Sequence, residues 1–266
     1  MKKYCILIAS VFLMASCSEY QKLLKSNDYE LKYTKAVEYF EKGDYMRANT
    51  LFDEITRYFQ GSERSEDLLN YIARSYMGQK DYYMAGEYYR LYVRTYPKGK
   101  YVQDARFMIG YVFYLESPDP RLDQTSTYKA IDAFQEFIDY YPRNERVPEA
   151  NKLLDELTEK LAYKELLNAR LYYNLGTYGG NNYRSAVIVA ENALKKYPAT
   201  QYREDFSFLM LQAKYQQAVL SVHDKQADRY TDTVDEYYSY INEFPEGKYR
   251  KQADRILRDA SKYVEN

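Results

Sequence analysis

Few side chains in this sequence are of a type that performs chemistry. His223 is the only histidine in the 266 residues, so neither a histidine–cysteine metal site nor a Ser-His-Asp arrangement can form. The pair Gly179–Gly180 is not followed by Lys-Ser or Lys-Thr and is therefore no phosphate-binding loop. Asp235 and Glu236 fit a solvated helix face better than a general acid–base pair. The sequence predicts no catalytic residue, no metal ligand, no cofactor and no enzyme.

Cys17 is the residue for which the sequence predicts a chemical modification. Residues 2–3 are basic, residues 4–13 are apolar, and Met-Ala-Ser leads into the cysteine, which is the layout of a secretory signal. The apolar run is shorter than the roughly 20 residues that span a bilayer. The segment 14–17 resembles the lipobox of bacterial lipoproteins, apart from Met14, where Leu is preferred. We expect residues 1–16 to be a signal peptide and Cys17 to carry diacylglycerol and an acyl chain such as palmitate. The alternative is a secreted protein in which Cys17 is incidental.

The charge balance argues against nucleic acid as a partner. The 38 basic and 39 acidic residues give a formal net charge of −1, and removing Lys2 and Lys3 leaves 36 against 39. A nucleic-acid binder normally has a basic excess. Aromatic residues are abundant instead, with 35 Tyr and 11 Phe but no Trp. Tyrosine suits both packing between helices and exposed recognition surfaces, and we expect both uses here.

One unit recurs along the chain. An aromatic residue followed by proline stands at residues 96–97, 141–142, 197–198 and 244–245, and the first copy has Gln60 in place of the proline. Small alanines let two antiparallel helices approach closely, and proline ends the second helix. The sequence predicts an all-α fold, a right-handed superhelix of about five tetratricopeptide-like helix hairpins. The clearest copy has the tetratricopeptide spacing of Leu69, Ile72, Ala73 and Tyr76 on one helix, then Ala85, Tyr89, Tyr92 and Pro97.

Two stretches interrupt the rhythm of short helices. Residues 117–123 are rich in Pro and Asp and predict a loop. Residues 149–175 lack Pro and Gly and space their leucines as a helix does, which predicts one long bridging helix. Residues 249–264 predict a C-terminal capping helix. The predicted divisions are a lipid-anchored tether at 17–30, an N-terminal half of three repeats at 31–147, and the bridging helix with a two-repeat C-terminal half and cap at 148–266.

The first helices of such a stack line a groove in which partners usually lie. Aromatic side chains surround one central cation, Arg74, in the predicted groove of the N-terminal half. This combination favours an extended or helical peptide that has aromatic residues and a carboxylate. The alternative is that several of these rings belong to the core between repeats. The groove candidates are Tyr33, Val37, Phe40, Asn70, Arg74, Met77, Phe107, Tyr111 and Tyr114.

A narrower resemblance rests on the lipobox, the five repeats, the long helix and three segments. These segments are Ala-Arg-Leu-Tyr-Tyr at 169–173, Tyr-Arg-Ser-Ala at 183–186 and Tyr-Pro at 197–198. Together they resemble the BamD family of outer membrane assembly lipoproteins. The resemblance implies a periplasm-facing protein, anchored in the outer membrane, that binds unfolded outer membrane protein precursors and the periplasmic domains of BamA. It places precursor recognition in the N-terminal half and BamA binding mainly in the C-terminal half. The missing tryptophans and the high tyrosine content leave the family's binding residues unassigned.

Two other classes stay open at this point. One is a periplasmic tetratricopeptide scaffold that coordinates cell-envelope or cell-wall synthesis. The other is a glycan-binding lipoprotein of the SusD-like type, although such proteins are usually about twice this length and rich in Trp at the sugar platform. Co-purifying proteins would separate the first class, and the absence of Trp counts against the second.

Overall fold

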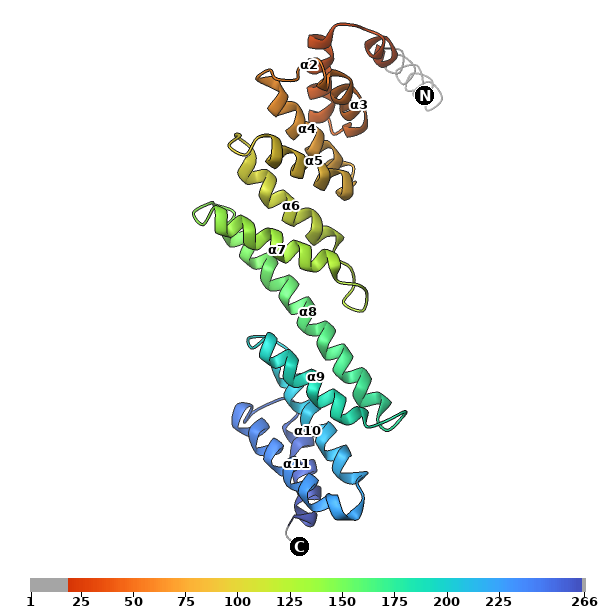
Figure 1. The fold of residues 1–266 in the computed structure, drawn as a ribbon, viewed down its shortest axis with the longest axis vertical. Helices are drawn as coiled ribbons and strands as arrows, with labels where there is room; N and C mark the ends of the chain where they lie inside the picture. Colours follow the sequence, from red (N-terminus) through yellow and green to blue (C-terminus); the bar gives the residue numbers. More distant parts are fainter. Residues whose placement is uncertain (1–18, 265–266) are drawn as a thin grey trace, which may run out of the picture. The chain divides into compact units, whose positions relative to one another are not determined.

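The computed structural model describes residues 19–264, and these residues form helices and turns without a strand (Figure 1). The all-α prediction is therefore confirmed. The N-terminal signal and Cys17 lie outside the described residues. The helices are α2 (Tyr29–Glu41), α3 (Tyr45–Thr56), α4 (Arg64–Gly78), α5 (Tyr82–Thr95), α6 (Val102–Glu116), α7 (Thr125–Tyr140), α8 (Val147–Leu175), α9 (Asn182–Lys196), α10 (Arg203–Val219), α11 (His223–Glu243) and α12 (Arg250–Ala260), followed by the 3-10 helix η1 (Ser261–Tyr263).

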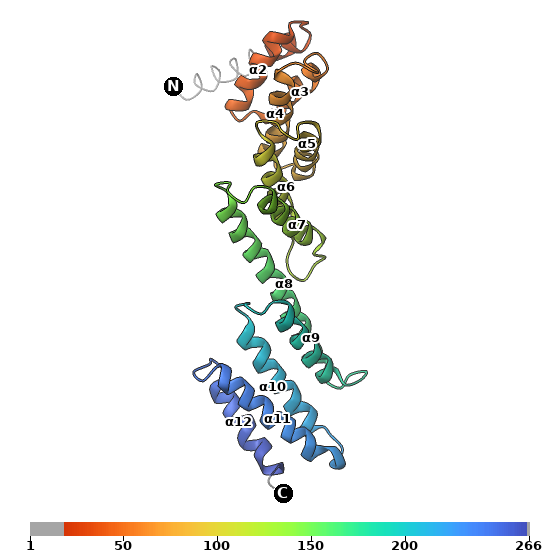
Figure 2. The ribbon, with the colours of Figure 1, turned by 60° about the vertical axis from the view of Figure 1, so that its left-hand side comes forward.

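The chain divides into two compact units. Unit 1 comprises Met1–Ser117 and Thr125–Asn151, and unit 2 comprises Pro118–Gln124 and Lys152–Asn266. Consecutive helices pack on one another from α2 to α7 in unit 1 and from α9 to α12 in unit 2 (Figures 1 and 2). The long helix predicted over 149–175 is present as α8. The capping helix predicted over 249–264 ends earlier, at Ala260, and continues as η1.

Alanines occupy the positions where helices approach most closely. Ala73 and Ala85, which the repeat pattern places at the contact between paired helices, have no exposed surface. Equivalent alanines of the other repeats are buried as completely, because a larger side chain would hold the helices apart. These alanines are Ala36, Ala48, Ala130, Ala186 and Ala190.

The ends of the helices follow from local sequence. Asp28, Asp44, Asp81 and Asn181 each precede a helix, and each side chain accepts a hydrogen bond from the backbone N–H three residues later. These caps satisfy donors that have no partner within the helix. At the other end, the aromatic residue before proline leaves the helical backbone conformation, as at Tyr96 with φ −124° and ψ 65°. Proline disfavours helical backbone in the residue before it, so the helix stops there.

The N-terminal segment of the described residues is packed on the first helix hairpin of unit 1. Residues 19–24 are helical, within the stretch predicted as a tether. Leu23 is buried, and Tyr20 packs edge-on against Tyr39 with ring centroids 5.6 Å apart. The buried Lys32 donates a 2.9 Å hydrogen bond to the carbonyl of Leu24 and pairs with Glu54. These contacts hold the segment against α2 and α3.

An acidic pair in the first turn of α4 fixes the start of α6. Glu66 accepts hydrogen bonds from the Tyr92 hydroxyl and from the backbone N–H of Lys100. Asp67 accepts a 2.7 Å hydrogen bond from the Tyr101 hydroxyl and pairs with the Lys100 ammonium at 2.5 Å. Because charge-assisted hydrogen bonds are the strong ones, this clamp positions the residues of α6 that face α4.

The same clamp recurs in unit 2. Glu204, in the first turn of α10, accepts hydrogen bonds from the Tyr240 hydroxyl at 2.8 Å and the Tyr249 N–H at 3.3 Å. Asp205 accepts from the Tyr249 hydroxyl at 2.7 Å and from Lys248 at 2.6 Å. The segments that complete the two clamps are Pro-Lys-Gly-Lys-Tyr at 97–101 and Pro-Glu-Gly-Lys-Tyr at 245–249.

Asp205 is kept ionised by its neighbours. Burial opposes the charged form, but hydrogen bonds from Lys248 and Tyr249, with the nearby charge of Arg170, hold the pKa of Asp205 below its ordinary value. Arg170 of α8 lies 2.9 Å from the Asp205 carboxylate. The carboxylate therefore links α8, α10 and the start of α12 through charged contacts.

Candidate functional site

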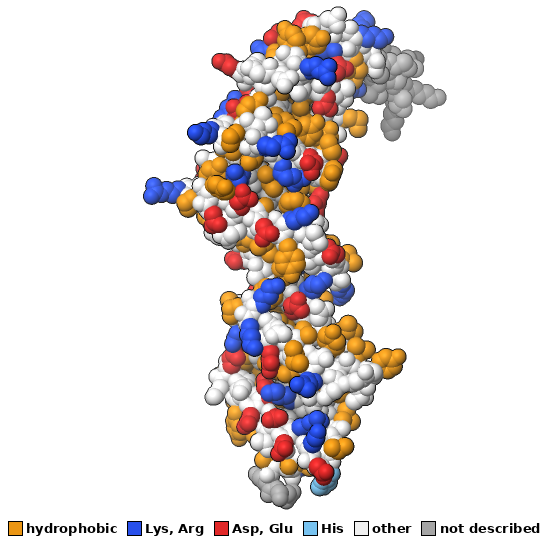
Figure 3. Space-filling model, viewed as in Figure 1, with side chains coloured by type: hydrophobic (Ala, Val, Ile, Leu, Met, Phe, Trp, Pro, Cys, Tyr) orange, Lys and Arg blue, Asp and Glu red, His pale blue; other side chains and the backbone are white. Residues whose placement is uncertain are grey.

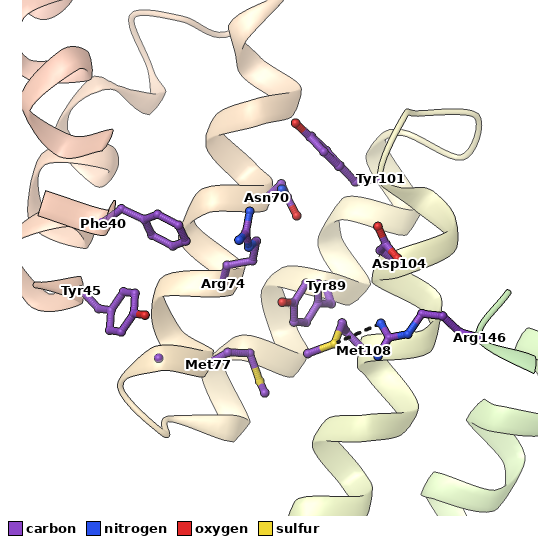
Figure 4. A pocket seen from close by; sticks show the side chains of 11 residues that line it. Phe40, Tyr45, Asn70, Arg74, Met77, Tyr89, Tyr101, Asp104, Met108 and Arg146 are labelled. Atoms are coloured by element: carbon purple, nitrogen blue, oxygen red, sulfur yellow. Dashed lines mark hydrogen bonds between the residues drawn. The ribbon is translucent and has the colours of Figure 1, made fainter. Parts of the chain in front are cut away.

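A groove in unit 1 lies where the first helices of successive repeats meet. Its volume is about 630 Å³, within the range of small-ligand and peptide sites. Side chains from α2 to α6, together with the residue before α8, line it (Figure 4). The lining residues are Phe40, Tyr45, Asn70, Arg74, Met77, Gly78, Tyr89, Tyr101, Asp104, Met108 and Arg146.

Arg74 projects from α4 into this groove (Figure 4). Its guanidinium carbon lies 4.9 Å from the centroid of the Phe40 ring, and Phe40 in turn contacts the Tyr45 ring edge-on at 5.5 Å. Within residues 19–264, Arg74 makes no hydrogen bond and no ion pair. A guanidinium with five donors, held over an aromatic face and left without an anion, is suited to a carboxylate.

A second cation borders the groove. The guanidinium carbon of Arg146 lies 3.4 Å from the centroid of the Phe107 ring. Its Nε donates to Glu149 at 3.0 Å, and its Nη1 lies 4.0 Å from the Met108 sulfur (Figure 4). Arg146 is thus partly neutralised by Glu149, whereas Arg74 is not, so Arg74 is the stronger site for an incoming anion.

The groove also contains polar groups that no other described residue engages. The Asn70 amide, the Asp104 carboxylate and the Tyr89 hydroxyl form no hydrogen bond within residues 19–264. Burial raises the pKa of Tyr89, so its phenol stays protonated and available as a donor at neutral pH. Asn70 both donates and accepts. The groove can therefore bind a carboxylate and backbone amide groups at the same time.

Four of the nine predicted groove residues line this groove: Phe40, Asn70, Arg74 and Met77. Phe107 does not line the groove, so its prediction as a groove residue was wrong. Its ring has no exposed surface, because Phe134 and Phe137 pack against it at 5.4 and 5.5 Å and Arg146 covers its face.

The remaining four candidates lie apart from the groove. Tyr33 contacts Phe59 edge-on at 5.8 Å, and Val37 packs against the core of the first repeats. Tyr111 and Tyr114 stack on each other at 5.9 Å. Phe107 is a core residue of its own repeat, because Phe134 and Phe137 belong to α7, the partner helix of α6. Tyr33 and Val37 pack partly against the core of the first repeats.

Sequence reasoning missed the other seven lining residues, including the charged residues Asp104 and Arg146. Asp104 lies in the first turn of α6, which the clamp at Glu66 and Asp67 brings next to α4. Arg146 precedes α8 and lies outside the first-helix pattern that generated the candidates. The sequence did contain a signal for the position of Asp104, because Asp104 lies three residues after Tyr101, the tyrosine that follows Pro-Lys-Gly-Lys. Arg146 had none, because it reaches the groove only through tertiary packing.

Charges of both signs are mixed on the face of the described residues that Figure 3 shows. In the view of Figure 3, Lys and Arg alternate with Asp and Glu, and hydrophobic side chains are scattered between them. Within residues 19–264, no helix is long and apolar enough to cross a bilayer. His223 is exposed at the first residue of α11.

Two relatives of this chain are named as outer membrane protein assembly factors. The chain is 24% identical over 261 residues to a putative outer membrane protein assembly factor BamD of Aquifex aeolicus, covering 97% of this chain and 82% of that protein. It is 26% identical over 230 residues to the outer membrane protein assembly factor BamD of Caulobacter vibrioides, covering 81% and 74%. The tetratricopeptide domain of P58(IPK) aligns with a TM-score of 0.42 at 13% identity, covering 92% of this chain and 68% of that one, a likeness too distant to support an argument.

The match to a protein family covers more of the chain than any single motif does. The family described as YfiO, outer membrane lipoprotein, matches residues 26–217. This range runs from before α2 to near the end of α10 and so includes every residue of the unit 1 groove. The chain belongs to the YfiO family of outer membrane lipoproteins.

Proposed function

We propose that this chain is an outer membrane protein assembly factor whose unit 1 groove binds the C-terminal end of unfolded outer membrane protein precursors. The names of its BamD relatives support the assembly role. The observation that carries the binding role is Arg74, whose guanidinium lies over the Phe40 ring in a groove of about 630 Å³ and has no ion-pair partner among residues 19–264.

The groove offers separate contacts for the parts of an aromatic C-terminal residue. The terminal carboxylate pairs with Arg74, and the aromatic ring lies among Phe40, Tyr45 and Met77. The Asn70 amide then meets the preceding peptide group. Asp104 disfavours acidic side chains next to the terminal residue, because like charges repel at short range in a partly desolvated site.

The anchor and the protein partner complete the proposal. Cys17 carries the lipid that attaches the chain to the outer membrane on its periplasmic side. The periplasmic domains of BamA bind mainly to the region after Glu149, which leaves the unit 1 groove open to precursors. The chain acts by binding and presenting its partners and catalyses no reaction.

A photo-crosslinking experiment tests the proposed site in cells. Met77 lines the groove and is replaced by a photo-reactive amino acid; Tyr83, 66% exposed on α5 and outside the groove, is the matched control position. We expect illumination to join position 77, but not position 83, to the last residues of a barrel precursor. Equal adducts at both positions, adducts to other parts of the precursor, or no precursor adduct at position 77 would count against the groove. The last of these results would favour a scaffold that coordinates envelope synthesis.

A further inference from the structure

Unit 2 has a groove at the position that corresponds to the groove of unit 1. Its volume is about 330 Å³, and α8, α10 and α12 line it. Figure 2 shows α10, α11 and α12 packed together in this unit. The lining residues are Tyr173, Phe208, Gln212, Tyr215, Gln216, Gln252, Arg255, Ile256 and Asp259.

The repeated clamps give the correspondence between the two grooves. Arg74 follows Glu66 by the same number of residues as Gln212 follows Glu204. Likewise, Asp104 follows Tyr101 as Gln252 follows Tyr249. Glu66 and Glu204 each accept a hydrogen bond from a tyrosine hydroxyl, and Asp67 and Asp205 each bind the Lys and Tyr side chains of the following segment, so these pairs occupy equivalent places. The charged pair of unit 1 is thus replaced in unit 2 by two carboxamides.

Most polar side chains that line the unit 2 groove form no hydrogen bond with another described residue. Among residues 19–264, the side chains of Gln212, Gln216 and Gln252 form no hydrogen bond, and neither do the hydroxyls of Tyr173 and Tyr215. The charged residues that line the groove are Arg255 and Asp259, so the formal charge of the lining is zero, and Asp259 pairs with Lys262 at 2.9 Å. A carboxamide both donates and accepts hydrogen bonds, so these side chains, together with the aromatic walls, suit a ligand that does the same.

We propose that the unit 2 groove binds an extended, uncharged stretch of polypeptide through its backbone. Gln212 and Gln216 are one helical turn apart on α10, which places neighbouring side chains about 5–6 Å from each other. Alternate residues of an extended strand are about 6.6 Å apart, so the two carboxamides meet successive peptide groups on one edge. The rings of Tyr173, Phe208 and Tyr215 contact the side chains that point toward the groove. This site goes beyond the proposed function, because it needs neither a terminal carboxylate nor Arg74.

A titration with a capped peptide tests the site. The probe is a labelled peptide of about ten alternating Thr and Tyr residues, acetylated and amidated, titrated into the full mature chain by fluorescence anisotropy. The double variant Gln212→Ala/Gln252→Ala should weaken binding about tenfold or more, because it removes several hydrogen bonds at once. The matched control is Gln217→Ala on the same helix, whose side chain faces Asn181 at 3.5 Å, and it should bind as the wild type does.

Three further arms decide what is recognised. N-methylation of alternate peptide groups removes backbone donors and should abolish binding to the wild type. The variant Gln212→Arg/Gln252→Asp places the charged pair of unit 1 in the unit 2 groove and should also fail to bind the capped peptide. Because both new side chains are polar, this variant controls for a folding defect in the alanine variant. Arg74→Ala should keep full affinity for the capped peptide, and this separates the site from the unit 1 groove.

The proposal is overturned by any of four results. These are no binding of the capped peptide to the wild type, equal binding by the double alanine variant, equal binding of the N-methylated peptide, or a loss on Arg74→Ala as large as that of the unit 2 variants. The last result would assign the peptide to the unit 1 groove and would leave the proposed function of that groove intact.

Discussion

The clamp of unit 2 makes the removal of a single hydroxyl group measurable. Tyr240 is 1% exposed, and its hydroxyl donates a 2.8 Å hydrogen bond to the Glu204 carboxylate. Tyr240→Phe removes that donor without changing the shape of the ring. Glu204 then keeps only the Tyr249 N–H, at 3.3 Å. Hydrogen bonds to charged groups contribute about 1.5–3 kcal/mol, so we expect the free energy of unfolding to fall by about that amount.

Gly247 provides an independent route to the same contact. A Cβ at this position would lie 2.5 Å from the Glu204 carboxylate and 2.6 Å from the Tyr240 hydroxyl. Gly247→Ala should therefore destabilise the protein by displacing both groups. In the Tyr240→Phe background the same change should cost less, because one of the two clashes is absent and the hydrogen bond is already lost.

Urea unfolding followed by far-ultraviolet circular dichroism measures these losses. The control is Tyr238→Phe, which removes a hydroxyl from a ring that is 57% exposed and hydrogen-bonded to no described residue. We expect that change to stay within about 0.5 kcal/mol of the wild type. Equal losses for Tyr240→Phe and Tyr238→Phe would refute the clamp as a source of stability.

Three other expectations follow from the fold, the charges and the sequence. Ala73→Leu or Ala85→Leu should cost about 1–3 kcal/mol by overpacking a helix pair, while the exposed Lys98→Leu should cost little; equal thermal melts would show that the repeat register is wrong. Because the folded state lowers the pKa of Asp205, its contribution to stability is complete above the ordinary carboxyl pKa of about 3.9 and is lost as the pH falls through the folded-state value. Asp205→Asn should therefore reduce the loss of stability at acid pH, which is measured from urea unfolding midpoints between about pH 6 and pH 2. An unchanged dependence of the midpoint on pH would argue against this role. Cys17→Ala should move the protein from the membrane fraction to the soluble periplasm and end fatty-acid incorporation, since acyl chains contribute about 0.8 kcal/mol per buried CH₂; unchanged fractionation would exclude the lipid anchor.

Much of the fold was predictable because its signals are local and periodic. Aromatic-proline pairs mark helix ends through the backbone restriction that proline imposes, and Ala73 and Ala85 are buried where the repeat places them. The long helix α8 follows from a stretch without Pro or Gly. The caps at Asp44 and Asp81 had an equally local signal that the repeat pattern alone does not use.

The groove was only partly predictable, because its lining depends on tertiary contacts. Arg74 and Met77 follow from their positions on a first helix, and both line the groove. The same register extended to α6 fails at Phe107, since Arg146 folds over that ring from outside the repeat pattern. The equivalence of the two clamps becomes clear only when the hydrogen bonds of Glu66 and Glu204 are compared.

The central claim is that Arg74 binds the terminal carboxylate of a precursor, and one four-way titration tests it most directly. A barrel-derived C-terminal peptide and its amidated form are titrated against wild type and Arg74→Ala, with Arg94→Ala on α5, outside the groove, as the matched control. We expect Arg74→Ala to weaken the free-acid peptide about tenfold or more, because charge-assisted hydrogen bonds contribute roughly 1.5–3 kcal/mol. Amidation should cause a similar loss in the wild type and in Arg94→Ala, but little further loss in Arg74→Ala, since the same contact is removed twice. Equal affinity in all four combinations of wild type and Arg74→Ala would contradict the account.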